Sequence, residues 1–424
     1  MKRRQGYSFR LNPKPSRHAR LNQALGANRW VWNRLLAMNW LRLQNQQPLL
    51  WYHEMDWFIK LWKKSEEYGF LSLAPAQSLQ QTAKALDRAF HDAFDKKQPG
   101  KRLPVFKKRG KNEAGIRYPQ HVKLDANNSV IQLPKLGWVK YRNSRPVAGD
   151  IKNVTVSRKA GHYTVSIQTE REVDAPVHPA NTSVGIDMGI VRFATLSDGS
   201  FIEPKNSFKR QAEQLANAQR KLARQVKFSA NWHKQRAVIA RQHHTIANVR
   251  NDFLHQASTR ISKNHAMIMI EDLKISNMSK SAAGTTAQPG KRVAQKRGLN
   301  RAILDQGWGE FRRQLEYKQQ WRGGWVLAVP PHHSSQECPQ CHTTHPTNRI
   351  SQELFRCGRC QFEANADFVG SVIVQQRGLA ILAGKPTGGH PEIACEVSGV
   401  VKPPAAGTRL SIVSNNNAGG ILAL

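Results

Sequence analysis

Two Cys-x-x-Cys motifs constrain the fold of this chain more than any other feature of its sequence. Cys338-Pro-Gln-Cys341 and Cys357-Gly-Arg-Cys360 are separated by fifteen residues. Two such motifs at this separation can close one tetrahedral zinc site. The chain has only five cysteines, which argues against four unrelated core cysteines, and nothing in the sequence marks secretion, which argues against disulfides. We therefore expect a zinc ribbon at residues 337–360, with Cys395 playing no part in it.

The charge balance indicates a polyanionic partner. The chain of 424 residues has 65 Lys and Arg against 29 Asp and Glu, a formal net charge of +36. Such an excess favours a nucleic acid, whose bound counterions are released when the protein binds. With 39% hydrophobic residues and 11 tryptophans, the chain can still build cores, unlike a disordered basic tail. A membrane partner is not expected, because no signal peptide or apolar anchor is visible. These features predict an intracellular, cytoplasmic protein.

Residues 1–172 are expected to form an N-terminal nucleic-acid-binding region. Residues 5–11 alternate apolar and polar side chains as in a half-buried strand. Residues 16–97 then show helical spacing and predict a helical subdomain. Short strands separated by Asn, Gly and Pro turns follow. Strands on both sides of a helical block suggest a small β-barrel with the helices inserted in it. The strands expected after the helices are Val130–Leu133, Trp138–Tyr141, Val154–Ser157 and Tyr163–Gln168.

After a linker at 173–181, the pattern changes to α/β. A strand at 184–189 precedes two long polar helices, near 207–226 and 231–262, whose apolar seams predict an antiparallel hairpin. Between Lys205 and Arg250 there are eleven Lys or Arg residues and one acid. Most charge runs are simply solvated faces, but here the two signs are not interspersed. We therefore expect this hairpin to contact a nucleic-acid backbone.

The remaining elements complete a domain that the zinc ribbon interrupts. We expect this domain to comprise residues 181–336 and 361–378, and we expect residues 379–424, rich in Gly, Pro and Asn, to be a disordered tail. The further elements expected are a buried strand at 266–270, a flexible basic loop at 279–300, a helix near 303–322, a strand at 325–329 and a helix at 369–376.

Three acids stand at the ends or starts of predicted core elements: Asp187, Glu271 and Asp367. Carboxylates that converge without a cationic partner repel one another unless divalent cations bind between them. The trio therefore suits two Mg²⁺ ions about 4 Å apart that catalyse phosphodiester hydrolysis. The alternative is that each acid is an ordinary cap or surface residue. Asp272 is a second alternative, as it is adjacent to Glu271 but faces the opposite side of a strand.

Other polar residues are assigned lesser roles. His243, His244 and His255 lie on the polar hairpin and are interpreted as phosphate contacts or as residues without a role, not as metal ligands. Asp198 is expected to make a Ser-Asp-Gly turn.

Gly185–Gly189 with Phe193–Gly199 resembles the opening strands of the RuvC-like nuclease in the TnpB family. Members of this family are the OrfB-type products of bacterial insertion sequences; they are often called transposases and are related to type V CRISPR effectors. The chain departs from the family in one place, behind the ribbon: the family usually reads Asp-Arg-Asp-x-Asn-Ala-Ala where this chain has Asn365–Ser371. The other matching segments are Tyr7–Leu11, Trp32-Asn33, Pro104–Lys108, Asn248–His255, Ile270–Leu273, Ser334–Cys341 and Cys357–Cys360.

The resemblance implies an RNA-guided DNA endonuclease with a RuvC-like (RNase H-like) α/β domain in an α+β multidomain chain. Its partners would be a guide RNA from the transposon end and double-stranded target DNA with a short adjacent motif. Asp187, Glu271 and Asp367 would hold catalytic Mg²⁺, while the zinc ribbon would be structural. Such a protein would lie in the bacterial cytoplasm, associated with the nucleoid. Two alternatives stay open: a nuclease-inactive RNA-guided DNA-binding protein, and a transposase that joins DNA ends in transposition or recombination.

Overall fold

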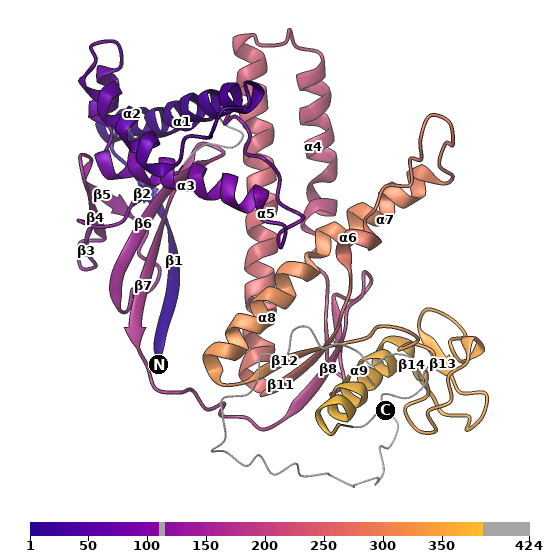
Figure 1. Cartoon of the computed structure of the whole chain (residues 1–424). Coiled ribbons are helices and arrows are strands. Elements are labelled where there is room, and N and C mark those ends of the chain that lie inside the picture. The colour runs from indigo at the N-terminus through magenta and orange to yellow at the C-terminus, as the bar shows by residue number, and fades with distance from the viewer. Residues whose placement is uncertain (110–114, 385–424) are drawn as a thin grey trace. The chain divides into compact units, whose positions relative to one another are not determined.

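The computed structural model describes residues 1–109 and 115–384, which form two compact units. The first unit comprises Met1–Ala180, Glu203–Asn264 and Lys274–Gly324, and the second comprises Asn181–Ile202, His265–Leu273 and the residues from Trp325 onward. The helices predicted for the middle of the chain therefore pack with the N-terminal region. Because compact packing and functional domains need not coincide, the predicted domain bounds stay a prediction. Figure 1 shows the elements of both units.

A seven-stranded antiparallel sheet forms the first unit's β layer. In the order β2-β6-β7-β1-β5-β4-β3, the long strand β1 lies near the middle. Tyr7, Phe9 and Leu11 alternate between exposed neighbours and are buried, as the sequence predicts. No pairing between β2 and β3 closes this sheet among the described strands, so the β-barrel stays a prediction. The strands are β1 (Lys2–Asn12), β2 (Ile116–Tyr118), β3 (Lys123–Asp125), β4 (Val130–Leu133), β5 (Gly137–Tyr141), β6 (Asp150–Lys159) and β7 (His162–Glu172).

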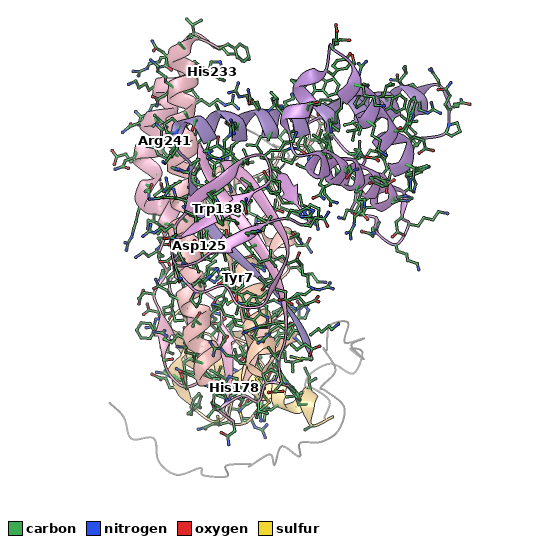
Figure 2. All side chains as sticks on the ribbon, turned by 90° about the vertical axis from the view of Figure 1, so that its left-hand side faces the viewer. Tyr7, Asp125, Trp138, His178, His233 and Arg241 are labelled. Atoms are coloured by element: carbon green, nitrogen blue, oxygen red, sulfur yellow. The ribbon has the colours of Figure 1, made fainter. Side chains whose placement is uncertain are left out.

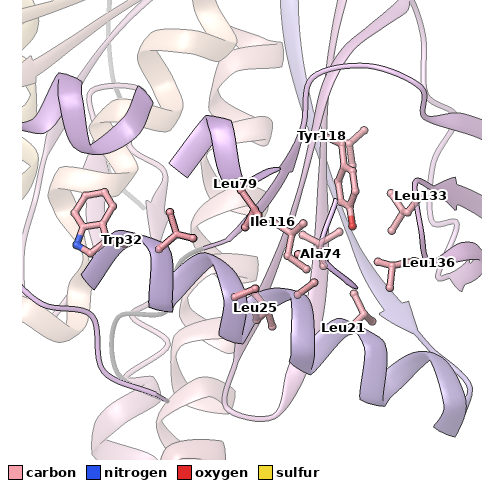
Figure 3. Close-up of a cluster of buried hydrophobic side chains, with 14 of the residues drawn as sticks. Leu21, Leu25, Trp32, Ala74, Leu79, Ile116, Tyr118, Leu133 and Leu136 are labelled. Atoms are coloured by element: carbon pink, nitrogen blue, oxygen red, sulfur yellow. The ribbon is translucent and has the colours of Figure 1, made fainter. Parts of the chain in front are cut away.

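The predicted helical insertion is confirmed between β1 and β2. Its core is continuous with that of the sheet, and Figure 3 shows leucines of α1 packed against Ile116 and Tyr118 of β2. A buried polar residue, Asn28, is satisfied there: its Oδ1 accepts hydrogen bonds from Ser78 Oγ (2.8 Å) and Thr82 Oγ1 (2.6 Å). The elements are α1 (Pro15–Gln44), α2 (Tyr52–Lys64), the 3₁₀ helix η1 (Gly69–Leu73) and α3 (Ala76–Phe94).

The predicted helical hairpin is also present, as α4 (Ser207–Ala223) and α5 (Ala230–Asn264). Figure 2 shows His233 near the end where the two helices connect. Two predictions for the following segment were wrong. The basic loop ends early because α7 (Val293–Gln306) begins inside it, and the helix expected at 303–322 is broken at Gly307, where φ of +73° separates α7 from α8 (Trp308–Arg322). A short helix, α6 (Ile275–Met278), precedes them.

The second unit contains a five-stranded mixed sheet in the order β10-β9-β8-β11-β12. Strands β8, β11 and β12 run parallel, while β9 and β10 are antiparallel. Gly185 of β8 allows close approach of the final helix, because a Cβ there would lie 2.1 Å from the backbone oxygen of Ser371. The strands are β8 (Ser183–Asp187), β9 (Ala194–Leu196), β10 (Phe201–Ile202), β11 (Met267–Glu271) and β12 (Trp325–Val329).

The final helix, α9 (Ala366–Leu382), is longer than the predicted 369–376. It therefore includes the first residues of the expected disordered tail, and most of that tail, residues 385–424, lies outside the described residues. In the described part of the chain, no helix has both the length and the apolar character that crossing a membrane requires.

Candidate active site and metal centre

Asp187 and Glu271 lie at the carboxyl ends of adjacent parallel strands. Asp187 is the last residue of β8 and Glu271 the last of β11, and the preceding residues, Ile186 and Ile270, are register partners. The side chain of Glu271 is 7% exposed, because the apolar run before it buries this end of β11. The parallel pairing thus brings two predicted site residues to one edge of the sheet.

Asp367 joins them from the first turn of α9. Asn365 caps this helix, and its Oδ1 accepts hydrogen bonds from the backbone N–H groups of Asp367 (3.1 Å) and Phe368 (3.3 Å). One turn later, a Cβ added at Gly370 would lie 3.2 Å from Asp187 Oδ2. The start of α9 therefore packs directly on Asp187, although the residues around Asp367 differ from the family's usual pattern.

The electrostatics of the trio are those of converging carboxylates. Burial raises the pKa of Asp187 to about 8, and repulsion from Glu271 and Asp367 contributes to the rise. Burial also raises the pKa of Glu271 and that of Asp367. A raised pKa means that the ionised carboxylate is less stable in the protein than in water, and a nearby cation would stabilise it.

Arginines only partly offset this repulsion. Arg349 lies 3.9 Å from Asp367 Oδ1, and it opposes the rise in the pKa of both Asp367 and Asp187. Arg192 has a smaller effect of the same sign on Asp367. Arg377 likewise opposes the rise in the pKa of Glu271, so three positive charges lie near the acids without neutralising them.

The chemistry of the three residues fits a hard divalent cation such as Mg²⁺, which prefers carboxylate oxygens. The three oxygen donors come from two strand ends and one helix start, all within the second unit. They are not gathered as tightly as the cysteines described below: in the described part of the chain, the cysteine cluster is the group of possible ligands whose atoms could hold an ion as they stand.

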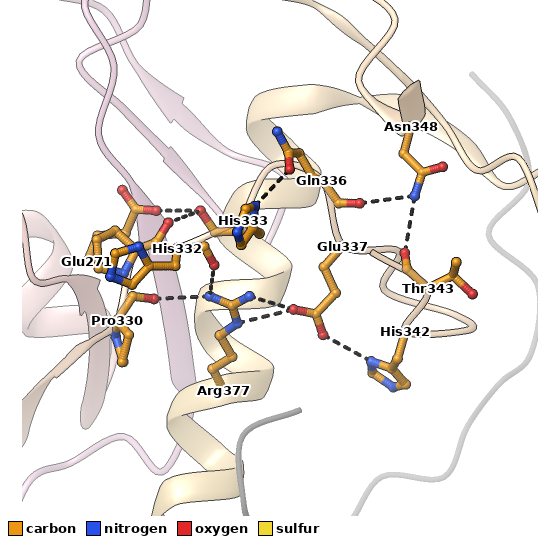
Figure 4. A network of polar contacts seen from close by, with 12 residues as sticks. Glu271, Pro330, His332, His333, Gln336, Glu337, His342, Thr343, Asn348 and Arg377 are labelled. Atoms are coloured by element: carbon orange, nitrogen blue, oxygen red, sulfur yellow. Dashed lines mark hydrogen bonds and ion pairs between the residues drawn. The ribbon is translucent and has the colours of Figure 1, made fainter. Parts of the chain in front are cut away.

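A hydrogen-bond network that the sequence reasoning missed supports Glu271. Ser334 Oγ donates to Glu271 Oε1 at 2.7 Å. Arg377 of α9 holds the segment that carries Ser334, donating to the backbone oxygens of Pro330 (3.0 Å) and His332 (2.7 Å) and to Glu337 Oε2 (2.6 Å). Figure 4 shows these contacts converging on the Arg377 guanidinium. The only sequence signal was that Ser334 opens the segment matching the TnpB ribbon.

The predicted zinc ligands come together as one cluster. The ligand atoms of Cys338, Cys341, Cys357 and Cys360 all lie within 4.8 Å of one another. The Cys338–Cys360 and Cys341–Cys357 sulfur pairs are 3.5 Å apart, far beyond the length of a disulfide bond of about 2.05 Å. Four sulfurs at this spacing fit a tetrahedral ion with Zn–S bonds of about 2.3 Å.

Asn348 ties the two Cys-x-x-Cys turns to each other. Its Nδ2 donates to the backbone oxygens of Gln336 (3.0 Å) and Thr343 (3.1 Å), and its Oδ1 accepts from the N–H of Gly358 (3.1 Å). On either side of the second turn, β13 (Leu354–Arg356) and β14 (Glu363–Asn365) form a two-stranded antiparallel sheet. These contacts hold the two cysteine turns beside each other.

The remaining predicted residues fall outside both sites. Asp272 is exposed, which favours Glu271 as the buried acid of this pair. Asp198 makes the expected turn, accepting a hydrogen bond from the N–H of Ser200 at 2.8 Å. His243, His244 and His255 lie on α5 and belong to no metal-binding group in the described part of the chain.

Sequence comparisons identify the family. A protein of Escherichia coli (strain K12), named "Putative RNA-guided DNA endonuclease InsQ", is 52% identical over 383 residues, which cover 90% of this chain and 94% of that protein. The chain belongs to the TnpB family. A second relative, "Putative RNA-guided DNA endonuclease" of Streptomyces pristinaespiralis, is 33% identical over 344 residues, 80% of this chain and 81% of that protein.

Profiles of the TnpB-related families match three segments. "Probable transposase" matches residues 166–282, and "Cas12f1-like, TNB domain" matches residues 308–374, which include the cysteines. "Helix-turn-helix domain" matches residues 1–47, where the structure has instead one strand, β1, and one long helix, α1. A cryo-EM structure of a Cas12f1–guide RNA–target DNA complex aligns with 89% of this chain and 100% of that chain at 12% identity, but with a TM-score of 0.32, too low to support an argument.

Proposed function

We propose that this member of the TnpB family is an RNA-guided DNA endonuclease that hydrolyses phosphodiester bonds at a RuvC-like site. One observation carries the proposal. Asp187 and Glu271 are the last residues of adjacent parallel strands, and Asp367, on the helix that packs against Asp187, helps to raise the pKa of Asp187. The strand order β10-β9-β8-β11-β12 supports a RuvC-like fold for this unit. The names of both relatives support the guided nuclease.

Asp187, Glu271 and Asp367 are the proposed ligands of two Mg²⁺ ions. Bound there, the ions would supply an activated water and charge stabilisation at the leaving oxygen. The chain itself positions the carboxylates: the β8–β11 pairing fixes two of them, and the Asn365 cap fixes the start of the helix that carries the third. The three carboxylates would thus hold the cations, and the cations would in turn bind the scissile phosphate.

The cysteine cluster is proposed to hold a structural Zn²⁺. All four ligand positions are occupied by protein, so none stays open for a substrate. The basic first unit is proposed to bind the guide RNA, the RNA–DNA heteroduplex and a short motif beside the target, with base pairing to the guide selecting the sequence. Residues 1–172 would form its barrel-and-helix region.

The test begins with purification of the full-length chain from cells that carry the element's own transposon end. The bound RNA is sequenced and the complex is incubated with a plasmid that contains a matching target and Mg²⁺. Wild type should cut the plasmid, whereas Asp187→Ala and Asp367→Ala should bind the same RNA and leave the plasmid intact. Cleavage that survives both substitutions would overturn the proposed site.

The profile match to "Probable transposase" favours a second candidate, an enzyme that joins DNA ends. Strand transfer also uses carboxylates and metal ions, so the site alone does not separate the two. A DNA-joining product formed by wild type and lost with Asp187→Ala would support this candidate. Target binding by wild type without any cutting would instead indicate a nuclease-inactive guided binder.

A further inference from the structure

The connection between α4 and α5 forms a strongly basic tip on the hairpin. Residues 224–236, called here the hairpin tip, contain four Lys or Arg residues and no acid. Figure 2 shows His233 of this tip at the end of the hairpin. Basic surfaces of this kind attract nucleic acid, but charge alone does not distinguish a binding site from a solvated turn.

The tip also exposes apolar side chains. Val226 is 79% exposed and Phe228 is 67% exposed. Single exposed apolar residues are common and need no explanation. The backbone at Phe228 is less ordinary: its φ is +70°, in the left-handed region that bulky residues rarely adopt. A turn that served only to connect two helices would be more stable with Gly or Asn at this position.

The phenylalanine ring belongs to an aromatic and cationic group. Phe228 and Trp232 have ring centroids 5.4 Å apart. Lys227 Nζ lies 5.3 Å from the Phe228 ring, and the Arg236 guanidinium lies 5.4 Å from the Trp232 ring. Two adjacent rings flanked by cations have the composition of sites that stack unpaired bases and hold the phosphates beside them.

Local contacts hold this group in place. Ser229 Oγ accepts a hydrogen bond from the N–H of Trp232 at 3.2 Å, at the first turn of α5. Gln235 is buried, and its Nε2 donates to the backbone oxygen of Ala218 in α4 at 3.0 Å. The rings are therefore presented from a fixed turn between two packed helices, which lowers the entropy lost on binding.

We propose that the hairpin tip is a stacking platform for an unpaired base of the bound RNA, with Phe228 as the exposed ring. This inference rests on the proposed function, which supplies the RNA. Unstacked bases are characteristic of RNA loops and bulges, and aromatic side chains are their usual partners. The cations and the lack of acids in this segment favour a nucleic acid over a protein surface as the ligand.

The decisive variant is Phe228→Gly in the full-length protein. Glycine relieves the left-handed backbone while it removes the ring, so the melting temperature should stay equal or rise. Affinity for the co-purifying RNA, measured by gel shift at several salt concentrations, should fall about tenfold. The slope of log affinity against log salt should not change, because no phosphate contact is lost. Lys227→Gln should lower that slope instead.

Control variants test whether the loss of any exposed aromatic ring, and not only that of Phe228, lowers RNA affinity. Phe201→Ala removes an exposed ring of the second unit, 45% exposed, and should leave RNA affinity unchanged. Phe228→Tyr should keep affinity near that of wild type. Photo-crosslinking of the wild-type complex should join residues 226–232 to one RNA nucleotide.

Three results would overturn the inference. RNA affinity equal to that of wild type in both Phe228→Gly and the double variant Phe228→Gly/Trp232→Ala would contradict the proposed platform. If Phe228→Gly lowers affinity only for a matched single-stranded DNA oligonucleotide and not for the RNA, the ligand of the platform would be DNA. A wild-type protein that purifies without RNA would overturn the proposed function as well, which distinguishes that failure from a failure of the platform alone.

Discussion

Ser334 Oγ donates a hydrogen bond of 2.7 Å to Glu271 Oε1, and it links the segment before the zinc ribbon to the acid at the end of β11. Both residues are buried. Groups that orient a metal ligand in this way typically contribute 10–100-fold to metal affinity or activity. The hydroxyl is thus placed to fix the direction of the Glu271 carboxylate.

Ser334→Ala should therefore raise the Mg²⁺ concentration needed for half-maximal cleavage by about tenfold. RNA affinity should be unchanged, because the buried hydroxyl is bonded to Glu271 and not exposed to a ligand. The matched control is Ser371→Ala, which removes another buried hydroxyl of the same unit, one bonded to the backbone oxygen of Phe368. Equal Mg²⁺ requirements in the two variants would contradict a positioning role for Ser334.

Gly370→Ala should lower the cleavage rate although it strengthens the helix. A Cβ at Gly370 would lie 3.2 Å from Asp187 Oδ2, so Asp187 or α9 must shift by a few tenths of an ångström. Gly298→Ala in α7 is the matched control, because a Cβ there meets no atom within 4 Å. It should raise stability by up to about 1 kcal/mol and leave cleavage unchanged. Single-turnover rates and thermal melts distinguish the two; a Gly370→Ala rate equal to wild type would count against this packing.

Asp187 should contribute progressively less to the stability of the metal-free protein as pH rises from about 4 to about 8. The folded state raises the pKa of Asp187 from 3.8 to about 8, so folded Asp187 retains a proton that the unfolded chain releases in this range. Because the unfolded state then binds fewer protons, stability decreases with rising pH. Thermal melts in chelator across this range should show a shallower fall for Asp187→Asn than for wild type.

Mg²⁺ should reverse this effect, since the proposed site would bind it through ionised carboxylates. The rise in melting temperature on adding Mg²⁺ should be larger at pH 8 than at pH 6, because protons compete for the same oxygens at lower pH. Identical pH dependence in wild type and Asp187→Asn, or an Mg²⁺ shift independent of pH, would contradict the proposed ligands.

Loss of zinc should impair cleavage as well as stability. Cys338, Phe355 and Cys357 share a buried cluster with Ala366 and Val369 at the start of α9, the helix that carries Asp367. Cys357→Ser should therefore lower the melting temperature and the cleavage rate together. Cys395, which lies beyond the described residues, belongs to neither Cys-x-x-Cys motif; Cys395→Ser is the control and should change neither. Full cleavage by a Cys357→Ser protein shown to lack zinc would mean that the active site does not depend on the zinc-bound ribbon.

The parts of the fold that followed from the sequence are those with strong local signals. Alternation in β1, helical periodicity in α1 and α3, and the spacing of the four cysteines each determine an element within a few residues. The apolar strands ending in Asp187 and Glu271 were identifiable for the same reason. The three acids could also be named from the sequence, because each adjoins a predicted core element.

What the sequence did not reveal depends on contacts between distant segments. The Arg377 guanidinium reaches three groups some 40 residues earlier in the chain, and no local pattern announces such a network. The break at Gly307 was missed because the helical pattern continues on both sides of it. Packing also decided that the α4–α5 hairpin belongs with the first unit, although along the chain it comes between β10 and β11, which belong to the second.

The most direct test of the central claim compares two adjacent acids. Glu271→Gln and Asp272→Asn each remove one charge with little change in shape, but Glu271 is the buried last residue of β11, whereas Asp272 follows the strand and is exposed. Cleavage of a matched plasmid by the purified RNA complex in Mg²⁺ is measured for both. The account predicts that Glu271→Gln abolishes cutting while target binding persists, and that Asp272→Asn cuts like wild type. Cutting by Glu271→Gln at the wild-type rate would contradict it.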